Sequence, residues 1–307
     1  MRHVPVLLDE VLEVIMPRDG GKYFDGTLGG GGHARAILER SAPTGELAGC
    51  DLDREALTRL ESEFASYGDR VHLFCRNFSE IDTICLMLGW KKLDGILLDL
   101  GMSSTALDSA HRGFSFSKDG PLDMRFSPEG TLTAHQVINS YDEDRLARII
   151  RTFGQERFAS RIARRIVESR QVTTTAELAD LVSSAIPRRY WPEHIHPATR
   201  TFQAIRMEVN AEVRHLEEFL PRAASLLDTG GTIAVISFHS IEDRIVKKFF
   251  SGARDSSASL RGLPPIETAD APNIRRLFSK PISPSPDEIQ RNPRSRSAHL
   301  RAARRVS

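Results

Sequence analysis

Four consecutive glycines, Gly29 to Gly32, are the feature that most restricts how this chain can fold. They separate an apolar run at residues 23–25 from a helix-like stretch at residues 34–38. Glycines leave the backbone bare, so a ligand can lie against it close to the helix N-terminus. A loose turn would lose conformational entropy on folding without any gain in packing. We therefore interpret residues 25–33 as a cofactor-binding loop between a strand and a helix.

Short apolar runs alternate with helix-like stretches between residues 22 and 100. The runs lie at residues 23–25, 46–51, 71–75 and 95–100, with helices expected at residues 35–40 and 54–64. This alternation is typical of strand-helix-strand units on a parallel sheet. It predicts an α/β fold with half of a doubly wound, Rossmann-like sheet in this part of the chain.

The pattern becomes helical after an irregular stretch at residues 113–128 that is rich in Gly, Pro, Ser and Asp. Helical spacing follows at residues 146–153 and 158–166, and a capping box of Thr174 and Glu177 opens a further helix that Pro187 ends. After a turn at Gly230 and Gly231, a buried strand is expected up to residue 237. The sequence thus predicts a sheet domain at residues 1–108 and 209–307, interrupted by an all-helical insert at residues 109–208.

The last part of the chain is less regular. Residues 251–295 are rich in Pro and Ser and predict a loop with one possible strand at residues 274–282. Residues 298–306 predict a final strand at the edge of the sheet.

The bulk composition suits an ordinary globular protein, with 40% hydrophobic and 27% charged residues in a chain of 307. No apolar run reaches the roughly 18 to 20 residues that cross a bilayer, and Asp9 and Glu10 interrupt the start, so we expect a cytoplasmic protein without membrane association. The three cysteines form no C-x-x-C pair, which predicts reduced and mostly buried thiols. His194 and His196 lack a third ligand at a suitable spacing, so no metal site is expected.

Arginine is clustered although the formal net charge is only +1. Residues 145–170 contain eight arginines against two acids, and after Glu288 the chain carries six arginines and no acid. Such clusters could contact RNA phosphates, or they could simply solvate helix faces and a tail. The pattern leaves both interpretations open.

Three carboxylates stand at the ends of expected strands. Asp25 repels a dianionic pyrophosphate but attracts the ammonium and sulfonium of S-adenosylmethionine, which favours that methyl donor. Gly29, Gly31 and Ala34 also satisfy a G-x-G-x-x-A pattern, so a nicotinamide cofactor stays open. Asp51 follows Gly32 by 19 residues, the distance from which a carboxylate accepts hydrogen bonds from ribose hydroxyls.

Phe78 stands just after the third strand, and the last of the three carboxylates, Asp99, ends the fourth. Phe78 could flank an adenine ring, or it could be an ordinary core residue. Asp99 ends a buried apolar run, where a carboxylate is costly unless it points into the crevice at the carboxyl end of the sheet. We therefore interpret Asp99 as a functional residue.

Seven motifs in this chain resemble, in the same order, those of the bacterial 16S rRNA cytosine-N4 methyltransferase family, also called MraW. They span nearly the whole chain: HVPVLLDE (3–10), DGTLGGGGH (25–33), DGILLDLGMSS (94–104), RGFSF (112–116), DGPLDMR (119–125), HPATRTFQ (196–203) and SFHSIEDR (237–244). The resemblance implies a methyltransferase fold with a helical insert. It also implies methyl transfer from S-adenosylmethionine to N4 of a decoding-centre cytosine of 16S rRNA in the small ribosomal subunit.

The family's cofactor contacts correspond to six residues of this chain, namely Gly31, Gly32, His33, Asp51, Phe78 and Asp99. Asp25 joins this expected site because of its charge. Ala106 stands where the family often has Gln, so it can offer at most a backbone contact to the cofactor. Arg200, in the HPATRTFQ motif, and Arg244, in SFHSIEDR, are the candidates for substrate binding, because guanidinium groups pair with phosphates.

The exocyclic nitrogen of cytosine is a poor nucleophile because its lone pair is delocalised into the ring. An acceptor must therefore take hydrogen bonds from the amino group. We hypothesise that Asp99 lies at the donor site and that His239 holds the cytosine or accepts its proton. DNA amino-methyltransferases have prolines and a stacking ring after the corresponding Asp or Asn, whereas this chain reads DLGM at residues 99–102, which disfavours a DNA substrate.

Other functions fit parts of the sequence. These are a methyltransferase for another RNA or amino-group substrate, a nicotinamide-dependent oxidoreductase, and a ribosome-binding protein with a vestigial cofactor site. Asp25 and the helical insert disfavour the oxidoreductase, and the intact loop with Asp51 and Asp99 disfavours the vestigial site. Either a monomer or a homodimer is compatible with the sequence.

Overall fold

The computed structural model describes residues 5–102, 109–252 and 273–306. The chain forms two compact units, one of residues 1–101 and 214–307 and the other of residues 102–213. The insert expected at residues 109–208 lies within the second unit. Among the described residues, no helix has the length and apolar character needed to cross a membrane.

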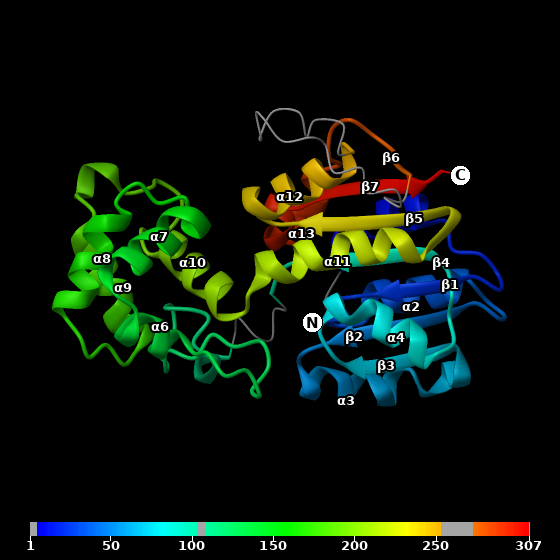
Figure 1. Ribbon diagram of the computed structural model, residues 1–307, viewed down its shortest axis with the longest axis horizontal. Helices are drawn as coiled ribbons and strands as arrows, with labels where there is room; N and C mark the ends of the chain where they lie inside the picture. Colours follow the sequence, from blue (N-terminus) through cyan, green and yellow to red (C-terminus); the bar gives the residue numbers. More distant parts are fainter. Residues whose placement is uncertain (1–4, 103–108, 253–272, 307) are drawn as a thin grey trace, which may run out of the picture. The chain divides into compact units, whose positions relative to one another are not determined.

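The first unit is built on a seven-stranded sheet in the order β3-β2-β1-β4-β5-β7-β6 (Figure 1). The first five strands in that order are parallel, and β7 and β6 are antiparallel to their neighbours. The order reverses between β1 and β4, so the carboxyl ends of these two strands flank a topological switch point, where open α/β sheets bind ligands. The strands are β1 (Lys22–Asp25), β2 (Glu46–Asp51), β3 (Val71–Cys75), β4 (Leu93–Asp99), β5 (Leu227–Ser237), β6 (Ile274–Arg276) and β7 (His299–Arg305).

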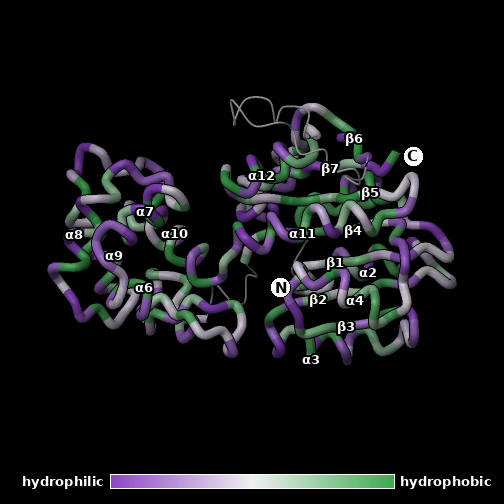
Figure 2. The backbone as a smooth tube through the Cα atoms, viewed as in Figure 1, coloured by the Kyte–Doolittle hydropathy of each residue, from purple (hydrophilic) through white to green (hydrophobic). Residues whose placement is uncertain are grey.

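Helices cover both faces of this sheet. One face packs against α1 (Leu8–Ile15), α2 (Gly32–Arg40) and α3 (Arg54–Glu63), around buried residues such as Tyr23 and Leu97. The other face packs against α4 (Ile81–Met87), α11 (Glu212–Leu226) and α12 (Ser240–Phe250), around Phe24 and Leu98. Neighbouring residues of β1 and β4 point to opposite faces of the sheet, and the residues on both faces are apolar because both faces are covered by helices. Figure 2 shows the central strands as largely hydrophobic.

Three expectations for the last third of the chain are wrong. Strand β7 is not at the edge, because β6 pairs with it and takes the edge position. The strand expected at residues 274–282 is only the three residues of β6, with Ile282 adding an isolated bridge to Leu300. Within the expected loop at residues 251–295, Ser285 caps a short helix, α13 (Pro286–Arg291), by accepting from the Glu288 amide.

The second unit is helical and has a core of its own. It contains α6 (Ala134–Ser140), α7 (Glu143–Gly154), α8 (Ala159–Glu168), α9 (Thr175–Ala185) and α10 (Thr199–Val209). Each expected punctuation signal is used: Gly154 ends α7, and Thr174 with Glu177 forms a capping box at α9. The apolar faces of these helices meet in one cluster with Phe114, Leu122 and Met124 from the preceding loop.

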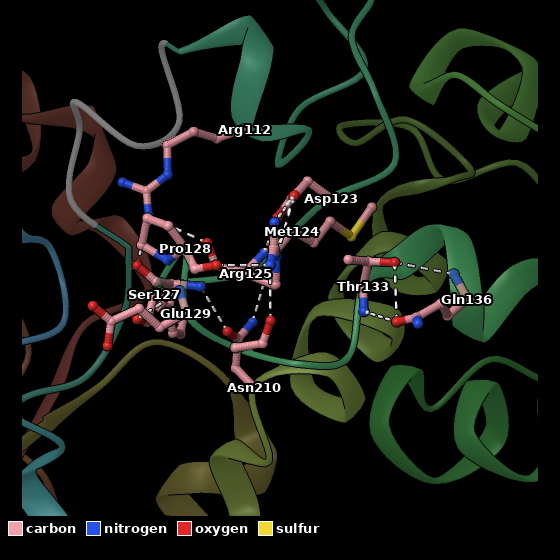
Figure 3. Close-up of polar contacts among 12 residues, drawn as sticks. Arg112, Asp123, Met124, Arg125, Ser127, Pro128, Glu129, Thr133, Gln136 and Asn210 are labelled. Carbon is pink, nitrogen blue, oxygen red and sulfur yellow. Dashed lines mark hydrogen bonds and ion pairs between the residues drawn. The ribbon is translucent and has the colours of Figure 1, made fainter.

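That loop is held by side chains that bind its backbone (Figure 3). The Asn210 amide donates to the Met124 carbonyl and accepts from the Phe126 amide, at 2.8 and 2.7 Å. Arg125 forms a bidentate ion pair with Asp123 and donates to two carbonyls of residues 128 and 130. The irregular stretch expected from its composition is therefore an ordered loop whose polar groups are paired.

The substitution Asn210→Ala should lower the free energy of unfolding by about 2 kcal/mol, because it leaves a part-buried carbonyl and amide without partners. Urea unfolding followed by circular dichroism measures this effect. Thr131→Ala, an exposed position on the same loop, serves as the control and should cost less than about 0.5 kcal/mol. Equal stabilities of the two variants would contradict the assigned role of Asn210.

Candidate active site

The glycine loop connects β1 to α2 at the carboxyl edge of the sheet. The Gly26 amide donates to the Leu97 carbonyl of β4, and the Leu28 amide donates to the Cys50 carbonyl of β2. These bonds tie the loop to the strands on both sides of β1. Gly31, with φ of 72°, is the N-cap of α2 and offers no side chain to its first amides. The loop therefore places free helical amides beside the strand ends.

At two of the four glycine positions, close packing leaves no room for a side chain, which the sequence alone did not show. A Cβ atom on Gly31 would lie 2.5 Å from Leu60 Cδ2, and one on Gly32 would lie 2.2 Å from Pro5 Cγ. At Gly29 the nearest atom would be 4.0 Å away. The expectation that the glycines bring no packing gain is thus wrong for Gly31 and Gly32, because α3 and the N-terminal segment close directly onto the loop.

Asp25, His33 and Asp99 come together at this edge. His33 Nε2 lies 3.7 Å from Asp99 Oδ2, and Asp25 is only 1% exposed. Burial raises the pKa of Asp25 to about 6, His33 opposes that shift, and Asp99 and Asp51 add to it. Three carboxylates therefore share one buried region, which makes it a strong site for a cation.

Several polar atoms of this group are buried without a hydrogen-bond partner among the described residues. They are Oδ1 of Asp99 and both ring nitrogens of His33. Buried polar atoms are normally paired, so orphaned ones indicate a ligand that supplies the partners. Thr27, which sequence reasoning missed, holds Asp99 in place, because its Oγ1 accepts a hydrogen bond from the Asp99 backbone amide at 2.6 Å. The only signal for Thr27 was its place in the glycine loop, two residues after Asp25.

Asp51 and Phe78 flank this group from the next strands. The Asp51 carboxylate accepts from the Gly29 and Asp53 amides, and burial raises its pKa. Each of the carboxylate oxygens has a second lone pair that can accept a further hydrogen bond. Phe78 lies edge-on to Phe219, with ring centroids 5.3 Å apart, so at least part of its role is packing.

His239 caps a helix in this structure. Its Nδ1 accepts from the Glu242 amide at the start of α12, and its Nε2 lies 3.0 Å from Glu242 Oε1 but outside hydrogen-bond geometry. The buried Glu242, which sequence reasoning also missed, in turn accepts from the Phe238 amide. The capping bond thus fixes His239 in position at the start of α12.

Of the remaining expected site residues, Arg200 and Arg244 have fewer contacts that fix their positions. Arg244 is exposed on α12. Arg200, at the start of α10 in the second unit, has a side chain that is 47% exposed and lies 3.9 Å from Glu156. Ala106 lies outside the described residues.

The three cysteines are free thiols. Cys50 and Cys85 are buried and Cys75 is exposed.

A family model described as the MraW methylase family matches residues 1–306. The chain belongs to this family. It is 49% identical to ribosomal RNA small subunit methyltransferase H of Syntrophotalea carbinolica, over 99% of this chain and 98% of that protein. The protein of the same name from Heliobacterium modesticaldum is 47% identical over the same shares of the two chains. The family assignment confirms the resemblance drawn from the motifs and makes the chain a methyltransferase with S-adenosylmethionine as its cofactor.

The substitution Gly31→Ala should destabilise the protein by about 2 to 4 kcal/mol, because the left-handed backbone and the contact with Leu60 both oppose a Cβ atom. Gly89→Ala is a matched control, since Gly89 also has a positive φ, 68°, but nothing within 4 Å of an added Cβ. It should cost about 1 to 2 kcal/mol. Chemical unfolding measures the loss of unfolding free energy in both variants. Equal losses would refute the packing argument.

Asp25→Asn should stabilise the ligand-free protein at pH 8, by an amount on the order of 2 kcal/mol. The folded-state pKa of Asp25, about 6, lies above its ordinary 3.8, so the favourable contribution of the protonated carboxyl is complete below about pH 4 and is lost as pH rises through 6. The gain should therefore disappear at pH 4. Urea unfolding at both pH values measures it, and an equal gain at pH 4 and pH 8 would be the contrary result.

Proposed function

We propose that this protein methylates N4 of a cytosine in the decoding centre of 16S rRNA, with S-adenosylmethionine as methyl donor. The observation that carries the proposal is the buried group of Asp25, His33 and Asp99, with an unpartnered Asp99 oxygen at the end of β4. Its negative charge suits a cationic cofactor. The name of these relatives, ribosomal RNA small subunit methyltransferase H, supports an rRNA substrate.

The chain's own residues suit the chemical groups of this cofactor. Asp25 and Asp99 offer carboxylates to an ammonium and a sulfonium, and Asp51 offers lone pairs to ribose hydroxyls. The amides of Gly31, Gly32 and His33 stand at the start of α2, and Phe78 offers a ring edge to adenine. When bound, the cofactor supplies an electrophilic methyl group.

Asp99 and His239 are the residues to which we assign the chemistry at the amino group. The free Asp99 oxygen accepts a hydrogen bond from the cytosine amino group, which returns electron density to its nitrogen. His239, fixed by the α12 cap, holds the base or takes the proton that N4 loses. We place this reaction in the cytoplasm, where ribosomal subunits are made, and assign the RNA phosphates to Arg200 and Arg244.

A nicotinamide-dependent oxidoreductase is the second candidate, because the glycine loop also fits a dinucleotide pattern. The buried carboxylates disfavour it, since a pyrophosphate beside Asp25, Asp51 and Asp99 would place like charges together in a region of low dielectric. Calorimetric titration should detect S-adenosylmethionine and not NADH. Tighter binding of NADH would reverse this choice.

Transfer of labelled methyl groups to small ribosomal subunits and to naked rRNA, followed by digestion to nucleosides, tests the substrate. We expect the label in N4-methylcytidine. Label in another nucleoside would disprove the N4 assignment, and label in protein alone would move the activity to another amino-group substrate.

The substitution Asp99→Asn should lower kcat by roughly a hundredfold or more, because the amide loses the charge that polarises the amino group. Asp94→Asn is the matched control at the opposite end of β4, where Asp94 binds Arg18 and the Lys22 amide, and it should retain kcat. Full transfer by the Asp99→Asn enzyme would exclude the role assigned to Asp99.

His239→Asn separates two roles of the histidine, since asparagine is a good N-cap. If His239 acts on the base, this variant should keep its thermal stability and lose most of its transfer. Full activity would show that capping is its whole contribution.

A further inference from the structure

The second unit carries an exposed group of aromatic rings and arginines that the site described above does not use. We call it the aromatic–arginine surface, and its members are Arg157, Phe158, Arg188, Arg189, Tyr190 and Trp191. Tyr190 is 41% exposed and Trp191 is 38% exposed. Exposed apolar side chains that lie together mark a binding site more often than singly exposed ones do. We propose that this surface binds an unpaired stretch of RNA by stacking bases on Tyr190 and Trp191.

The rings are held in place by local contacts. A short 3-10 helix, η4 (Arg188–Tyr190), follows α9, and the Trp191 indole N–H donates to the Ile186 carbonyl at 2.9 Å. The Tyr190 ring lies 5.3 Å from the Phe158 ring, which immediately precedes α8. Two segments about 30 residues apart in sequence thus present their rings together, and little side-chain freedom remains to be lost on stacking.

The arginines of this surface contact rings instead of acids. The Arg157 guanidinium lies 4.1 Å from the Tyr190 ring centroid, and the Arg189 guanidinium lies 4.9 Å from the same centroid. Arg188 is placed over Trp191 at 5.7 Å. No ion pair is found for these three arginines among the described residues. Their charge is therefore available to an anionic partner.

Further positive charge continues along α8. Arg161 and Arg165 are exposed and one helical turn apart, a spacing at which like charges repel. Neither has an ion pair within the described part of the chain. A polyanion would relieve this repulsion, and phosphates of a nucleic acid strand repeat at a spacing that several arginines can follow.

Stacking rings beside arginines are the features by which proteins bind single strands. Double-stranded RNA offers no unstacked bases, so it would use the arginines alone. A protein partner of acidic character would use the charge but has no particular need for two exposed rings. The combination therefore favours unpaired RNA. This inference rests on the proposed RNA substrate, but the binding test below requires no methyl transfer.

The full-length protein reports on this surface through its own fluorescence. It contains two tryptophans, Trp191 and the buried Trp90, which is 5% exposed. Titration with a short oligouridylate should quench the fluorescence of Trp191, because a stacked base quenches an indole. A hairpin duplex of equal length should quench much less. The Trp191→Phe variant should bind the oligouridylate with similar affinity but without the quenching.

Fluorescence anisotropy with a labelled oligouridylate then measures affinity. The double variant Y190A/W191A should bind about tenfold or more weakly than the wild type, and Y190F/W191F should stay within about threefold, because it keeps both rings. The variant R188Q/R189Q should reduce the slope of log K against log salt by about 1.4, at roughly 0.7 per phosphate contact on a single strand. Circular dichroism melting confirms that each variant is folded.

Three outcomes would overturn the proposal. The first is unchanged oligouridylate affinity in Y190A/W191A. The second is equal quenching by the duplex. The third is a wild-type dimer in sedimentation that Y190A/W191A converts to monomer, which would make the surface an interface between copies. The proposed function fails separately, if the wild type transfers no methyl group to small subunits or rRNA while still binding the oligouridylate.

Discussion

The burial of three carboxylates at one edge of a parallel sheet is the constraint on which the rest of the first unit depends. Asp25, Asp51 and Asp99 end neighbouring strands, and burial together with the charges of Asp99 and Asp51 makes ionisation of Asp25 costly, which raises its pKa. The fold meets this cost with backbone amides from residues 27, 29 and 53 and with His33. Part of the cost remains as the raised pKa of Asp25 and the unpaired Oδ1 of Asp99, and a cationic ligand would remove it. The candidate site is thus a region whose buried charge lowers the stability of the ligand-free fold.

The sequence predicted the parts of the molecule that follow from periodicity and punctuation. The strands ending at Asp25, Asp51 and Asp99 and the capping box of Thr174 and Glu177 were visible, because each depends on residues close together in the chain. The position of β7 was not visible. Its pairing with β5 and β6 joins segments separated by long stretches of sequence, and a short run of alternating residues looks the same at an edge or in the interior of a sheet.

The candidate site shows the same division. Charge and spacing pointed to Asp25 and Asp99, but the packing of Leu60 and Pro5 against the glycines could only be seen once α3 and the N-terminal segment were placed. Thr27 and Glu242 lie within two of the quoted motifs but were not singled out, because each acts by accepting a hydrogen bond from a backbone amide, a role that has no sequence signal of its own. His239 was found by motif, while its capping bond with the Glu242 amide came from the structure. Residues that position others are therefore the hardest to find by reading a chain.

The place of β7 in the sheet also affects how the protein can be made. The hydrogen-bonding edge of β5 is filled only by residues 299–305, which leave the ribosome more than 60 residues after β5 itself. Until then β5 is an unprotected edge with an almost wholly buried sequence, and such edges pair readily with other chains. During synthesis, the growing chain therefore passes through an interval of aggregation risk that ends only when its last strand is added.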